Sequence, residues 1–144
     1  MNRKEWIKKW KGNKRYTLKF VELVEEDQLT YKPTDGVKTY LSQLSHLATW
    51  MRTHSRFVTE VELEKVPLKT KEEVHHAIYS FFDTLLHYLD TAQEDALQQV
   101  VPMWYGQVSK EYILTVMDNH LAHHRGQLVV YQRLLGIKPP SYAT

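Results

Sequence analysis

The chain has 144 residues, enough for one domain and too few for two of ordinary size. Hydrophobic residues make up 42% of it and charged residues 25%, a balance that argues against a disordered protein. It contains no cysteine, which excludes disulfides, cysteine-ligated zinc and protein thiol nucleophiles, so any metal must be held by histidine, aspartate or glutamate.

The first predicted helix covers about residues 5–26, where apolar side chains recur at helical spacing from Trp6 to Val24. Gly12 and Asn13 weaken its middle, so residues 1–11 could form a separate turn. The first nineteen residues carry eight Lys or Arg and one acidic residue, a local charge of +7. We interpret this charge as the solvated face of the helix, and a nucleic-acid or membrane-binding arm is the alternative.

Two further helices are predicted in the middle of the chain. The turn cluster at 31–36 is followed by Thr39, a suitable N-cap for a helix that runs to about Val58. The connection at 59–70 alternates in part and contains a proline, which indicates extended backbone. Thr70 and Glu73 then form a capping-box pattern that predicts a third helix to about Gln99.

The fourth predicted helix begins after Ser109 and ends before Gly136 and Pro139-Pro140. Four amphipathic helices in a chain of this length predict an all-α four-helix bundle, a single domain over residues 1–144. No apolar run approaches the roughly 20 residues of a membrane span, and the N-terminus lacks the apolar core of a signal peptide. We therefore expect a cytoplasmic protein that does not bind membranes.

The strongest functional signal is a histidine pair on the fourth helix. His120 and His124 lie one turn apart, near the centre of the stripe predicted to face the core. Buried imidazoles cost free energy unless they are satisfied, and either a metal ion or a pair of hydrogen bonds would satisfy them. Histidine pairs at this spacing also occur by chance on helix surfaces, so spacing alone leaves the metal open. His123, at the edge of the stripe, is expected to pack at a helix–helix seam or to support the site rather than to bind an ion.

The neighbours of this pair carry weaker predictions. Arg125 is expected to point away from the pair as a surface or salt-bridging residue, and Gly126 to allow a neighbouring helix or chain to approach closely. Gln127 could bind a ligand imidazole or a substrate. A third metal ligand must come from elsewhere, and periodicity favours His46. The other candidates for that third position are His54, His75, His76 and His87.

Two segments of the chain resemble one known family. HLAHHRGQLVVYQRLLGIKPPSY (120–142) is similar to the C-terminal signature of the DinB/YfiT-like metalloenzymes, and YKPTDGVKTYLSQLSHLATW (31–50) matches their second-helix cap and histidine. The resemblance implies a four-helix bundle in which His46, His120 and His124 hold one divalent ion, most often zinc or nickel. It also implies a homodimer, and some relatives transfer low-molecular-weight thiols.

A metal ion held by three histidines with an open position could serve two reactions. It could turn water into hydroxide for hydrolysis, or hold a thiol as its nucleophilic thiolate. The histidine pair has no carboxylate beside it to act as a general base, which favours the thiol. With no cysteine, the chain would take that thiol from a small molecule such as bacillithiol or glutathione, and Gln127 or Tyr131 would orient the substrate.

Two alternatives to this thiol transferase remain open at this point, a metal-dependent hydrolase and a non-catalytic metal-binding or interaction bundle. We expect no specific nucleic-acid binding, because basic charge alone gives only salt-sensitive association that ignores sequence.

Overall fold

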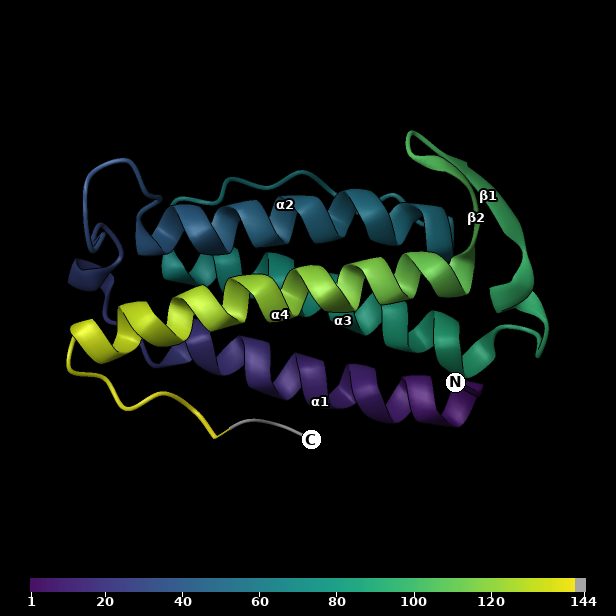
Figure 1. Ribbon diagram of the computed structural model, residues 1–144, viewed down its shortest axis with the longest axis horizontal. Coiled ribbons are helices and arrows are strands. Elements are labelled where there is room, and N and C mark those ends of the chain that lie inside the picture. Colours follow the sequence, from purple (N-terminus) through teal and green to yellow (C-terminus); the bar gives the residue numbers. More distant parts are fainter. Residues whose placement is uncertain (142–144) are drawn as a thin grey trace.

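The computed structural model describes residues 1–141, which form the predicted bundle of four long helices (Figure 1). Tyr142, the last residue of the C-terminal signature, lies outside the described residues. The first helix, α1, packs against α3 and α4, and α2 packs against the same two helices. The helices are α1 (Arg3–Glu22), α2 (Tyr40–Thr59), α3 (Lys71–Thr91) and α4 (Lys110–Leu134).

The segment between α2 and α3 is long because these two helices run in the same direction. Figure 1 shows α2 and α3 running in the same direction, so the chain must return along the bundle between them. After the left-handed backbone of Glu60, residues 61–70 make this return as an elongated segment outside helix and strand, in line with the extended connection predicted there (Figure 1). Ten residues can span at most about 33–36 Å, which is enough to pass a 20-residue helix about 30 Å long.

Hydroxyl side chains begin three of the helices, as predicted. Thr39, Thr70 and Ser109 each accept a hydrogen bond of 3.1 Å from the backbone N–H three residues later. Glu73 completes the capping box by accepting from the N–H of Thr70 at 3.1 Å. These bonds satisfy backbone donors that the first turn of a helix leaves without partners.

The predicted ends of two helices are wrong. The first helix is continuous through Gly12 and Asn13, with no separate turn, and it stops at Glu22 before a short 3₁₀ helix (Glu26–Gln28). The third stops at Thr91 rather than near Gln99.

The chain from 92 to 109 forms a 3₁₀ turn (Ala96–Gln98) and a β-hairpin that the sequence analysis did not predict. Strands β1 (Val100–Met103) and β2 (Gly106–Ser109) pair in antiparallel register around a two-residue tip, Trp104-Tyr105. The φ of +130° at Gly106 suits a tight turn that only glycine tolerates easily. Because Pro102 lies within a strand, the usual sequence signal for a hairpin is weak here.

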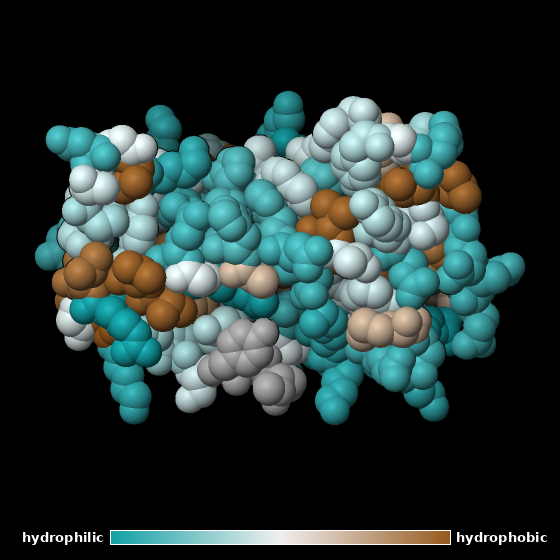
Figure 2. All heavy atoms as spheres, in the orientation of Figure 1, coloured by the Kyte–Doolittle hydropathy of each residue, from teal (hydrophilic) through white to brown (hydrophobic). Residues whose placement is uncertain are grey.

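Aromatic residues fill much of the interior, including Trp10, Phe20, Tyr40, Phe81 and Phe82, each less than 2% exposed. Figure 2 shows hydrophilic residues over most of one face, with hydrophobic residues gathered towards both ends. Within residues 1–141, none of the helices has the length and apolarity that crossing a membrane requires.

Candidate metal centre

The structure brings His46, His120 and His124 together between two neighbouring helices. His46 comes from α2, and the other two come from successive turns of α4. Their ring centroids are 4.5–5.6 Å apart, and one ligand nitrogen from each lies within 4.8 Å of the others. His124 is buried and His46 is exposed, so the cluster opens towards solvent on the side of α2.

The cluster fits a divalent metal ion. The Nε2 atoms of His120 and His124 are buried and have no hydrogen-bond partner within the described chain. Such atoms cost free energy, and a metal ion would satisfy both at once. The three imidazoles could hold one ion and leave a further position open, which is the arrangement of catalytic zinc sites.

Burial keeps these imidazoles neutral. Burial, followed by the charges of neighbouring histidines, lowers the pKa of His120 to about 3. Burial, followed by the charges of His46 and His123, lowers the pKa of His124 to about 4. The pKa of His46 is also lowered, first by burial and then by the charge of Lys38. Neutral imidazole is the form that binds metals, so the site is prepared for an ion at neutral pH.

A glutamine that the sequence analysis did not single out holds the buried histidine. The Oε1 atom of Gln43 lies 2.7 Å from Nδ1 of His124. Gln43 in turn donates from Nε2 to Oε1 of Gln127 at 2.6 Å, and Tyr131 donates its hydroxyl to the Lys38 carbonyl at 2.6 Å. Gln127 and Tyr131 also line the cavity beside the histidines, where a substrate could reach them. Their contact with a substrate stays a prediction.

The cavity beside the cluster has a volume of about 610 Å³ and is bounded by residues 33–38 and by the facing sides of α2 and α4. Among the described residues that line it, Lys38 is the one lysine or arginine, and none is a carboxylate. The cavity therefore offers a bound molecule positive charge and no general base of the aspartate or glutamate type.

An aromatic stack continues the site along α2. The Trp50 ring lies 3.8 Å from the ring of His120 and 3.3 Å from that of His54, with interplanar angles of 13° and 14°. His54, one of the candidate ligands, is buried against Trp50 and approaches Trp104 at the hairpin tip at 5.0 Å. It belongs to this stack, and the cluster of three does not include it.

The remaining histidines lie away from the cluster or at its edge. His75 is 3.6 Å from Glu22, and His76 and His87 are exposed on α3. His123 is exposed, lines the cavity and lies 3.0 Å from the amide nitrogen of Gln127, so it lies beside the cluster and not in a seam between helices.

The surface position predicted for Arg125 is wrong, and within the described residues no helix of this chain makes the close approach predicted at Gly126. Arg125 is 5% exposed, because α1 packs on that side of α4 and Asn13 accepts a hydrogen bond from its guanidinium at 2.9 Å. Gly126 has open space around it within the described residues, so no helix of this chain requires a glycine there.

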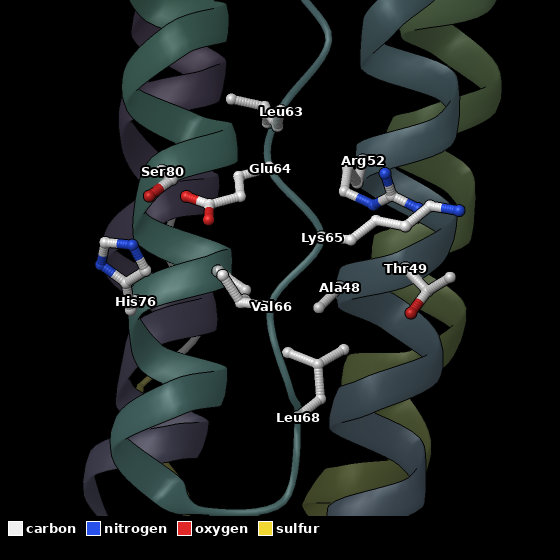
Figure 3. Close-up of a pocket in the computed structure, with 11 residues that line it drawn as sticks. Ala48, Thr49, Arg52, Leu63, Glu64, Lys65, Val66, Leu68, His76 and Ser80 are labelled. Carbon is white, nitrogen blue, oxygen red and sulfur yellow. The ribbon is translucent and has the colours of Figure 1, made fainter.

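A second cavity, of about 430 Å³, lies where the segment that carries Leu63 to Leu68 runs lengthwise between α2 and α3 (Figure 3). Arg52 and Lys65 point to the α2 side of the segment, whereas Glu64 points towards Ser80 on α3. Because these groups diverge, the cavity does not gather ligands around one point as the histidine cluster does.

Comparisons with known proteins agree with this architecture. A model of the DinB family matches residues 1–143. The fold is similar to a DinB-like protein from Bacillus subtilis, with a TM-score of 0.80, 18% identity, and 97% of this chain and 99% of that chain covered. It is also similar to a DinB-like protein from Bacillus cereus, with a TM-score of 0.75, 20% identity and 94% of each chain covered. A search of curated proteins finds no significant match.

Proposed function

Because the chain belongs to the DinB family, we propose that it is a metal-dependent transferase that joins a small-molecule thiol to an electrophilic substrate. His46, His120 and His124 hold the ion, for which zinc and nickel both suit three imidazole ligands. The observation that carries the proposal is the pair of buried, unpartnered Nε2 atoms on His120 and His124, described above for residues 1–141.

The surroundings favour a thiol over water as the nucleophile. An ion in this site, when bound, would stabilise the thiolate form of the thiol. A carboxylate base often assists the attack of a metal-bound water, and no carboxylate is among the described residues lining the cavity. The chain has no cysteine, so the thiol comes from a small molecule.

The proposed transfer changes no oxidation state and needs no oxidant or reductant. The thiol S–H bond breaks and its proton passes to solvent. The sulfur electron pair forms the new carbon–sulfur bond, and the leaving group departs with the pair of the bond it had to carbon. The protein binds and orients both partners in the cavity, with Gln127 and Tyr131 on its wall.

Metal content tests the site before any reaction is known. Protein purified without a histidine tag is expected to carry about one divalent ion per chain by elemental analysis. His120→Ala and His124→Ala should each lose most of it, whereas His87→Ala, at an exposed position on α3, should not. A metal content far below one ion that His120→Ala leaves unchanged would contradict the site.

The reaction is tested with the metal-loaded protein, bacillithiol or glutathione, and monochlorobimane as the electrophile. We expect a conjugate with loss of chloride, quantified by mass, and a large loss of rate in His124→Ala. Equal rates for His124→Ala and wild type with every thiol would reject the transferase. Metal-dependent cleavage of an ester or amide panel would instead support a hydrolase, and full metal content without either reaction would support a binding protein.

A further inference from the structure

The geometry points to Gln43 as a positioning residue that, oriented by Tyr131, keeps the proton of neutral His124 on Nδ1 and leaves Nε2 free to bind a metal ion. The role of Nε2 as a ligand rests on the proposed function. The position of the proton does not, because it is a property of the protein without metal.

Gln43 and His124 are 5% and 4% exposed, and 2.7 Å separates Oε1 of one from Nδ1 of the other. A buried pair of this kind must match one donor with one acceptor. Either Nδ1–H donates to the amide oxygen, or the amide is reversed and its NH₂ group donates to an unprotonated Nδ1. The two arrangements leave opposite nitrogens of His124 free, and the rest of the network must decide between them.

Tyr131 decides the orientation of the amide. Its hydroxyl has one proton, and it donates this proton to the backbone carbonyl of Lys38 at 2.6 Å. Towards Gln43, 3.5 Å away, the hydroxyl can therefore only accept. The NH₂ group of Gln43 must lie on that side, where it also donates to Oε1 of Gln127 at 2.6 Å. Its carbonyl oxygen is then left facing His124.

A reversed amide would place the Gln43 oxygen against the hydroxyl oxygen of Tyr131, whose proton is already used. It would also require Gln127 to reverse, since two amide oxygens would otherwise meet at 2.6 Å. The backbone carbonyl of Lys38, which cannot reverse, thus sets the direction of hydrogen bonding through Tyr131 and Gln43 to His124.

This direction matters for a metal site. A histidine that binds through Nε2 must be unprotonated there, and a hydrogen bond from its other N–H fixes both the tautomer and the ring orientation. Neutral imidazole in water favours the proton on Nε2, which is the wrong tautomer for such a ligand. Gln43 and Tyr131 therefore hold His124 ready before an ion arrives.

The first test measures the tautomer in metal-free protein. Histidine labelled with ¹⁵N is examined by NMR near pH 7.5, where the nitrogen shifts and the couplings to ring protons distinguish Nδ1–H from Nε2–H. We expect Nδ1–H for His124 in the wild type, a shift towards Nε2–H in Gln43→Leu, and a mixture in Tyr131→Phe. Wild-type His124 protonated on Nε2, or an unchanged tautomer in both variants, would overturn the inference.

The second test measures zinc affinity by competition with a chelator. Gln43→Leu should weaken binding by about 10- to 100-fold. Gln43→Glu, which keeps an acceptor for Nδ1–H, should restore most of it, and Gln93→Leu at an exposed position serves as the control. Equal affinity of Gln43→Leu and wild type would count against the positioning role. Absence of zinc binding in the wild type would reject the proposed function, while the NMR result would still decide the tautomer.

Discussion

The histidines of the cluster are weak bases because burial disfavours their charged forms. The folded protein should therefore lose stability in acid. The pKa of His120 is lowered to about 3 and that of His124 to about 4, against about 6.5 in an unfolded chain. Between these values the unfolded chain binds more protons than the folded one. The free energy of unfolding of metal-free protein is therefore retained above pH 6.5 and falls as the pH drops from 6.5 towards 4.

Removing one of these imidazoles should reduce this sensitivity to acid. His120→Phe keeps an aromatic ring beside Trp50 but cannot bind a proton. Between pH 7 and pH 5 it should lose about 1 kcal/mol less stability than the wild type, after allowance for the partial exposure of His120. Urea unfolding with EDTA at both pH values measures the difference. Parallel losses in the two proteins would show that the pKa of His120 is not lowered.

Lys38 should select anionic ligands, because among the described lining residues it is the one lysine or arginine and no carboxylate opposes it. In zinc-loaded protein, Lys38→Met should weaken binding of mercaptoacetate by about fivefold, or about 1 kcal/mol, and leave neutral mercaptoethanol nearly unchanged. Lys32→Met is the matched control, since Lys32 pairs with Asp35 and does not line the cavity. Calorimetric titration that shows equal losses for both thiols would contradict this role.

At the scale of single elements, what could be predicted from the sequence depends on how local each signal is. The caps at Thr39, Thr70 and Ser109 depend on hydrogen bonds within one turn of helix, which a short sequence pattern can predict. The structure confirms all three. The bond between Gln43 and His124 joins residues 81 positions apart, and no spacing rule connects them.

Helix α4 shows a second limit of sequence patterns. A single apolar stripe predicts one buried side, but α4 packs against both α2 and α1. Its second buried side carries polar groups that the stripe does not reveal. Arg125 lies there and donates to Asn13, which itself donates to Asp118 at 2.9 Å. Asn13, a weak point by helix propensity, is thus explained by a contact that forms only in the bundle.

Asn13 should contribute to stability more than its helix position suggests. Asn13→Ala removes an acceptor from the buried guanidinium of Arg125, and hydrogen bonds to charged groups contribute about 1.5–3 kcal/mol. We expect a loss of this size in the free energy of unfolding, measured in urea. Asn119→Ala, at an exposed position on α4, should change stability by about 0.5 kcal/mol or less. Similar losses in the two variants would show that the contact between α1 and α4 contributes little.

At the scale of the whole molecule, the hairpin closes one end of the bundle and leaves apolar side chains in solvent. Val100, Trp104 and Tyr112 are 59%, 67% and 52% exposed on the hairpin and the first turn of α4 that follows it (Figure 1). Large exposed apolar groups that gather at one place are typical of interaction surfaces. We expect the homodimer that the family resemblance implies to form through this end.

Sedimentation tests the assembly. The wild type at micromolar concentration should sediment as twice the 17.1 kDa chain mass. Trp104→Ser should shift the equilibrium towards the monomer, whereas Tyr79→Ser, at a position 46% exposed on α3, should not. A wild-type monomer would reject the dimer, and a dimer insensitive to Trp104→Ser would place the interface elsewhere.

The contact between Trp50 and His120, at 3.8 Å with nearly parallel rings, gives the protein an optical reporter of its own site. An indole emits in the near ultraviolet, and a paramagnetic ion such as nickel or cobalt quenches that emission when bound close by. Zinc, which has a filled d shell, should change the emission far less. Titrations with the two kinds of ion can thus be followed without a label, and Trp50→Phe separates this signal from the emission of Trp6, Trp10 and Trp104.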